Sequence, residues 1–116
     1  MHEAGIAAEI LEIAQAQSAL LGGARVAEVT VRVGDMSGVA PEALEFAFEA
    51  LREGEASGAV LVIKRIAVLA RCETCGTDSR PGADLVLWCA VCGKPLKVLE
   101  GEELMVESIE LEGDAE

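Results

Sequence analysis

The chain is poor in aromatic, basic and histidine side chains. Only 3% of its 116 residues are aromatic, with no tyrosine, and nine lysines and arginines stand against 21 aspartates and glutamates, for a formal net charge of -12. Nucleic acids and anionic membrane surfaces would repel so acidic a chain, so neither is expected as a partner. The scarcity of aromatic residues also means that the core must be built mostly from aliphatic side chains.

Long apolar runs are missing as well. No run approaches the roughly 20 residues that a membrane-spanning helix needs, and no basic stretch precedes an apolar segment at the N-terminus. We therefore expect a cytoplasmic protein. In that reducing compartment the four cysteines are not expected to form two structural disulfides, and a chain with 52% hydrophobic residues does not need them in order to fold.

The cysteines are arranged in two closely similar pairs. Cys72 and Cys75, and then Cys89 and Cys92, form two Cys-x-x-Cys motifs, and each motif is followed by a glycine. Two residues between thiolates allow one tight turn to present both sulfurs to one ion, and two such turns supply the four soft donors that suit a structural Zn²⁺ site. The alternatives are an iron site of the rubredoxin kind, two redox dithiols, or unrelated buried thiols.

Hydrophobic periodicity predicts two amphipathic helices and three strands. The helices are expected from about Glu3 to Leu21 and from Pro41 to about Gly54, each with an apolar stripe. The strands are expected at residues 25–33, 60–68 and 104–111. The two stripes consist of Ile6, Ile10, Ile13, Ala14 and Leu21 in the first helix and of Leu44, Ala47, Phe48 and Leu51 in the second.

The order of these elements predicts an α+β fold. The helix between the first two strands suits a parallel crossover, whereas the two strands that flank the cysteine-rich insertion suit antiparallel neighbours. We thus expect two helices on a three-stranded mixed sheet with an inserted four-cysteine zinc ribbon. Residues 1–69 and 99–116 would form a discontinuous α/β domain, and residues 70–98 the inserted zinc-ribbon domain.

The N-terminus carries a second arrangement of metal donors. His2 is the only histidine, and its size should keep Met1 in place, so that the terminal amine stays one residue from the imidazole. The amine, the His2 backbone nitrogen and the imidazole Nδ1 can close two adjacent chelate rings, and such nitrogen-rich fields select Ni²⁺ or Cu²⁺. An ordinary exposed terminus is the alternative. The fourth donor stays open between Glu3, a solvent molecule and a partner.

These features occur together in one known family. Met1-His2-Glu3, the segment 38–48, the paired cysteines and residues 101–104 with 108–110 resemble the HypA/HybF family of hydrogenase-maturation factors, over nearly the whole chain. The resemblance implies transient Ni(II) cargo at Met1, His2 and Glu3, so that the α/β domain would be the nickel-binding one. It also implies structural Zn(II) at Cys72, Cys75, Cys89 and Cys92.

The same resemblance implies the partners. The family works with a nickel-inserting GTPase and delivers nickel to the large subunit of [NiFe]-hydrogenase, and some members also serve urease through its accessory proteins. A homodimer is a further candidate assembly. Catalysis is not expected, because the sole histidine lies at the chain end and no nucleotide-binding loop is present. A scaffold that binds proteins through an acidic ribbon is the competing function.

Overall fold

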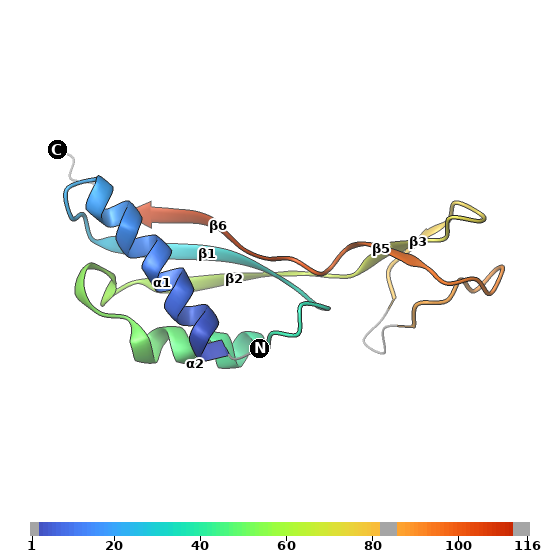
Figure 1. The fold of residues 1–116 in the computed structure, drawn as a ribbon, viewed down its shortest axis with the longest axis horizontal. Coiled ribbons are helices and arrows are strands. Elements are labelled where there is room, and N and C mark those ends of the chain that lie inside the picture. Colours follow the sequence, from blue (N-terminus) through green and yellow to red (C-terminus); the bar gives the residue numbers. More distant parts are fainter. Residues whose placement is uncertain (1–2, 82–85, 113–116) are drawn as a thin grey trace.

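The computed structural model describes residues 3–81 and 86–112 and has the shape of an elongated molecule with extents of 58 × 28 × 16 Å (Figure 1). Two helices and a three-stranded sheet form one end, and a smaller three-stranded sheet forms the other. The predicted fold class, with two helices on a mixed sheet and a four-cysteine insertion, is confirmed. Within the described part, neither helix has the length and apolarity that a bilayer-spanning segment needs.

Helix α1 (Glu3–Leu20) crosses the sheet diagonally (Figure 1). Its buried residues Ile6, Ile10 and Ala14 recur at four-residue steps, so that they line the side of the helix that meets the sheet. The expectation that Ile13 and Leu21 belong to this stripe is wrong, because they are 46% and 64% exposed. Ile13 borders an open groove between the helix and the sheet, and Leu21 lies beyond the helix end.

Helix α2 (Pro41–Leu51) begins with proline in its first turn, where the missing N–H costs no helical hydrogen bond. Leu44 and Phe48 are fully buried, whereas the expectation that Leu51 packs in the core is wrong, since it is 44% exposed at the last helical residue. The helix ends before the predicted Gly54, which instead opens a short 3-10 turn, η1 (Gly54–Ala56). The acidic side chains of α2 are exposed, as expected of a solvated face: Glu42, Glu45 and Glu49.

The larger sheet contains β1 (Val26–Gly34), β2 (Val60–Ile66) and β6 (Leu104–Leu111) in the order β2-β1-β6. The β1 and β2 strands are parallel, which confirms the predicted crossover through α2. The expectation that β2 and β6 are antiparallel neighbours is wrong, because β6 pairs with β1 on the side away from β2. The two ends of the insertion still lie close together, but they do so in the smaller sheet.

A bulge explains the uneven alternation of the last strand. Thr30 of β1 faces Ser108, but the next residue, Val31, faces Val106, so that Glu107 is an extra residue on β6. The bulge returns Leu104, Val106 and Ile109 to the core side of the sheet, where all three pack against buried residues. A period-two pattern read without the bulge places part of this strand on the wrong face.

The smaller sheet contains β3 (Leu69–Arg71), β4 (Asp78–Ser79) and β5 (Lys97–Glu100), with β3 in the centre. Both neighbours run antiparallel to β3. These strands were not expected from the sequence, because two to four residues are too few to show an alternating pattern. The sheet carries the two cysteine-containing loops at the far end of the molecule (Figure 1).

Two glycines allow the chain to cross itself where the two sheets join. Gly34 donates its N–H to the Glu103 carbonyl at 2.8 Å, and Met36 donates to the Gly101 carbonyl at 2.7 Å. A Cβ on Gly34 would overlap the Gly101 carbonyl, and a Cβ on Gly101, whose φ is +118°, would lie 2.8 Å from the Val68 Cα. The backbones therefore pack in direct contact, with no space for a side chain on either glycine.

We predict that Gly34→Ala lowers the free energy of unfolding by about 3 kcal/mol, because the new methyl group meets backbone that no side-chain rotation can move. Gly58→Ala is the matched control, since nothing lies within 4 Å of its added Cβ. It should change the stability by less than about 0.5 kcal/mol. Urea unfolding followed by circular dichroism measures both, and equal stabilities of the two variants would contradict the proposed contact.

Candidate metal centre

The two Cys-x-x-Cys motifs fold into two similar turns. In each turn the amide of the glycine that follows donates to the carbonyl of the first cysteine, from Gly76 to Cys72 at 2.6 Å and from Gly93 to Cys89 at 2.8 Å. Both glycines have positive φ, 74° and 73°, which side chains rarely tolerate. The local sequence therefore fixes two turns of the kind that present paired sulfurs.

The turns bring all four thiols together. The sulfurs of Cys72, Cys75, Cys89 and Cys92 lie within 4.8 Å of one another. Across the two turns, Cys72 Sγ lies 3.3 Å from Cys92 Sγ, and Cys75 Sγ lies 3.7 Å from Cys89 Sγ. Four sulfurs about 2.3 Å from a tetrahedral zinc ion would be about 3.8 Å apart, so the cluster has the dimensions that such an ion requires.

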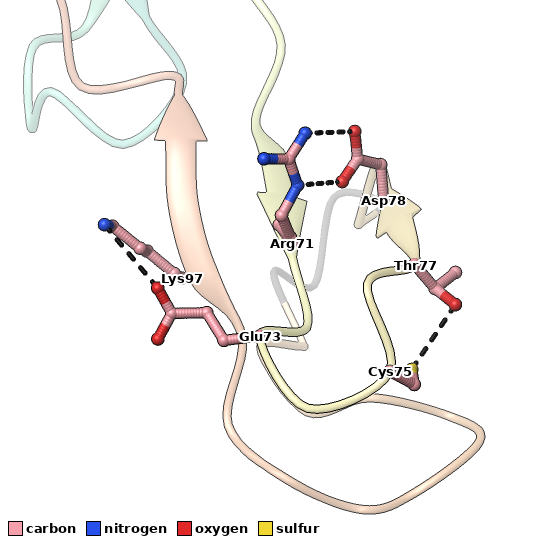
Figure 2. A network of polar contacts seen from close by, with 6 residues as sticks. All are labelled: Arg71, Glu73, Cys75, Thr77, Asp78 and Lys97. Carbon is pink, nitrogen blue, oxygen red and sulfur yellow. Dashed lines mark hydrogen bonds and ion pairs between the residues drawn. The ribbon is translucent and has the colours of Figure 1, made fainter.

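Hydrogen bonds near the cluster favour ionised sulfur at some positions. The Thr77 hydroxyl, 3.3 Å from Cys75 Sγ, and the Thr77 amide together lower the pKa of the Cys75 thiol to about 6. The backbone amides of Cys92 and Val91 lower the pKa of Cys89. Figure 2 shows Thr77 beside Cys75 in the first turn.

The fourth thiol is affected in the opposite direction. The Lys94 amide lowers the pKa of Cys92, but the neighbouring Cys72 and Cys89 sulfurs and partial burial outweigh it and raise this pKa to about 11. Sulfurs this close repel one another once they carry charge, so all four ionise together only around a cation. The donor set and its electrostatics thus fit a divalent ion that prefers thiolates.

Ion pairs brace the strands next to the first turn. Arg71 on β3 donates two hydrogen bonds to the Asp78 carboxylate on β4, at 2.7 and 3.1 Å, and Lys97 on β5 lies 3.6 Å from Glu73 (Figure 2). The paired charges raise the pKa of Arg71 and lower that of Asp78. These side chains are exposed, so the pairs fix the orientation of the strands more than they stabilise the fold.

Of the predicted nickel ligands, Glu3 lies within the part of the chain that the structure describes. Met1 and His2 fall outside the described residues, and Glu3 is the first residue of α1. Glu3 Oε2 accepts a hydrogen bond of 3.0 Å from the backbone N–H of Ala40, the residue that caps α2. The structure therefore brings the four cysteines together, and it places Glu3, the first residue of α1, beside the start of the second helix.

Two contacts of these sites were not identified from the sequence. Thr77 follows the first turn by two residues, and its hydroxyl contacts Cys75 as side chains next to metal-binding thiolates often do. The Ala40 contact with Glu3 is a backbone interaction between residues 37 positions apart, and no pattern in the sequence marks it.

Comparison with known proteins agrees with the predicted resemblance. The profile of a family described as "Hydrogenase/urease nickel incorporation, metallochaperone, hypA" matches residues 1–111. The hydrogenase maturation factor HypA of Geobacter metallireducens is 40% identical over 97% of this chain and 100% of its own length. That of Geotalea uraniireducens is 42% identical with the same coverage.

The fold is shared with a solved structure of the same kind. The solution structure of the Ni metallochaperone HypA from Helicobacter pylori superposes with a TM-score of 0.65, at 23% identity, over 96% of this chain and 97% of that one. The names of the family and of the relatives describe maturation factors and metallochaperones, so the prediction that the chain is not an enzyme is confirmed. The chain belongs to the HypA family of hydrogenase/urease nickel incorporation metallochaperones.

Proposed function

We propose that this protein carries Ni(II) at its N-terminus and helps to insert it into the large subunit of [NiFe]-hydrogenase. The family match over residues 1–111 is the observation that carries the proposal. The chain is a carrier of the ion rather than a catalyst, so its site must bind nickel selectively and also release it. A site at the end of the chain suits both needs, because few protein donors hold the ion and a partner's donors can replace them one at a time.

The nickel ligands we propose are Met1, His2 and Glu3. The terminal amine, the His2 backbone nitrogen and its imidazole offer three nitrogens in adjacent chelate rings, a donor set that favours Ni²⁺ over Zn²⁺. The Ala40 amide holds the Glu3 carboxylate at the start of α2, 3.0 Å away. Since Glu3 directly follows the two residues with nitrogen donors, this bond anchors the base of the terminal peptide to the folded part of the chain.

The second metal we propose is a structural Zn(II) held by Cys72, Cys75, Cys89 and Cys92. Four thiolates leave no open position for water or substrate, so the ion would order the ribbon and take no part in nickel chemistry. The ribbon has little apolar packing of its own: among its described residues, 70–81 and 86–98, the buried ones are Ala70 and two of the cysteines, Cys72 and Cys89. We therefore propose that residues 70–98 fold as a metal-dependent domain, inserted in a domain made of residues 1–69 and 99–116.

The partners we propose are those of hydrogenase maturation. They comprise a nickel-inserting GTPase, the hydrogenase large subunit and, for urease, its accessory proteins, all in the cytoplasm. The formal charge of -12 favours basic protein surfaces over nucleic acid or anionic membranes. Because the molecule is elongated, such partners could bind at the end with the larger sheet or at the end with the smaller one. A homodimer would be a further assembly.

We predict that Cys72→Ala reduces the zinc content from about one ion per chain to nearly none, because three thiolates do not close a tetrahedral site. Amide signals of residues 70–98 should collapse in NMR spectra, while the helical circular dichroism of α1 and α2 remains. Thr77→Val keeps all four thiols and should keep the zinc. X-ray absorption dominated by nitrogen or oxygen neighbours, or loss of all helicity in Cys72→Ala, would contradict this assignment.

We predict that His2→Ala abolishes stoichiometric Ni²⁺ binding in calorimetric titrations and leaves the zinc content unchanged, because the two sites share no ligand. A Gly-Ser extension before Met1 should weaken nickel almost as much, since it converts the terminal amine into an amide. Glu12→Ala, an exposed position on the same helix, serves as the control and should bind like the parent protein. If the extended protein binds nickel as tightly as the native one, the amine is not a ligand.

Nickel affinity should fall as the pH is lowered. The amine and the imidazole have reference pKa values of about 7.7–8.0 and 6.5, and both must be deprotonated to bind, so protons compete with the metal below these values. Between pH 8.5 and pH 6 the affinity should fall by at least about tenfold per pH unit below the amine pKa, and by at least about a hundredfold per pH unit below about pH 6.5, where both donors carry protons. A constant affinity across this range, measured by competition with a chromophoric chelator, would exclude the nitrogen donors.

A further inference from the structure

An apolar groove of about 500 Å³ lies beside the first half of α1. Helix α1 forms one wall with Ile6, Ile10 and Ile13, and the sheet forms the floor with Val31, Leu104 and Val106. These sheet residues all point to the side that carries the helices, so the groove opens within the helical layer of the molecule. It lies at the larger sheet, whereas the four cysteines lie in the loops that the smaller sheet carries.

The groove exists because α1 crosses the sheet at an angle (Figure 1). The beginning of β6 is therefore left without a helix above it, and Leu104 and Val106 are only partly buried although they pack against the core. On the helix wall, Ile13 is 46% exposed. Contiguous apolar surface of this kind, in a concave site, is typical of a place where another molecule binds.

A glycine on the groove wall has no internal explanation. Gly5 lines the groove within α1, yet nothing lies within 4 Å of the point that a Cβ would occupy, so packing inside the chain does not require its small size. Glycine is also the poorest helix former after proline. The distance between packed helices depends on the side chains at their contact, and a glycine there lets a second helix come closest.

The charge around the groove selects the partner. Glu9 lies on the groove wall, Glu12 is one turn further along, and α1 contains no lysine or arginine. Within residues 3–81 and 86–112, neither Glu9 nor Glu12 takes part in an ion pair. A second copy of the chain would bring its own excess of acidic residues to this site, whereas a basic segment would be attracted to it.

We propose that this groove is the docking site for a basic amphipathic helix of a partner protein. Its apolar side chains would fill the space between α1 and β6, its backbone would approach α1 at Gly5, and its lysines or arginines would lie near Glu9 and Glu12. A helix is favoured over an extended segment because it would complete the layer of helices that already covers the rest of this sheet face. The proposal depends on neither metal site.

The test uses the zinc-loaded full-length protein without nickel and a synthetic peptide of about 18 residues, long enough to form a helix. The peptide carries leucines at helical spacing on one face and lysines on the other, and a scrambled peptide of the same composition is the control for charge alone. We expect the patterned peptide to bind more tightly than the scrambled one. NMR shift changes should concentrate at Gly5, Ile10, Leu104 and Val106.

Substitutions then locate the site. Gly5→Leu should weaken the patterned peptide by about tenfold or more, because the new side chain occupies the groove, while Ala8→Leu on an exposed position of α1 should have little effect. Circular dichroism checks that α1 is intact, and leucine is a better helix former than glycine. If Gly5→Leu fails to fold, a second pair of variants tests the same site. Ile13→Glu should impair peptide binding, whereas Leu20→Glu, at a position outside the groove, should not.

Four outcomes would overturn the proposal. Equal binding of the patterned and scrambled peptides would leave only a charge effect, and shift changes centred on other residues would move the site elsewhere. Self-association in sedimentation experiments that Gly5→Leu abolishes would make a second copy the occupant. An extended peptide that binds the groove more tightly than the helical one would reject the helix.

Discussion

The crossing of the backbone at Gly34 and Gly101 is the contact on which the rest of the structure depends. The chain leaves the larger sheet through β2 and returns through β6, and both passages run beside the end of β1. Three consecutive backbone amides at the end of β1 bind both passages. Asp35 donates to the carbonyl of Ile66 at the end of β2, and Gly34 and Met36 donate to the carbonyls of Glu103 and Gly101 just before β6. Because no side chain separates them, the orientation of the cysteine-bearing sheet is set by backbone geometry rather than by an adjustable apolar interface.

Different forces hold the two parts that meet at this crossing. The larger part has a continuous core of aliphatic side chains around Phe48, with Val29, Val31 and Leu44 almost completely buried. In its described residues, the smaller part has short strands, exposed ion pairs and four clustered thiols in place of such a core. A bound metal ion supplies to a small module the free energy that a larger one obtains from burying apolar surface, so the proposed zinc has a structural reason to be present.

The sequence predicted best what depends on local chemistry. The start of α2 followed from Pro41, and the two cysteine-containing turns followed from the cysteine spacing. What it could not predict depends on tertiary placement: the tilt of α1 that leaves Ile13 exposed, the bulge at Glu107, and the position of β6 beside β1. The contact of Glu3 with Ala40 belongs to the same class, since it joins the starts of two helices that only the folded chain brings together.

The length of the molecule affects how its size appears in solution. The radius of gyration is 17.9 Å. A compact domain of this length would have about 13 Å, and a compact globule reaches 17.9 Å only at about 250 residues. A single chain thus has the dimensions of a globular protein about twice its mass. Size-exclusion chromatography would therefore assign the monomer the apparent mass of a dimer. Light scattering and sedimentation equilibrium measure molar mass independently of shape, so they would give the mass of one chain.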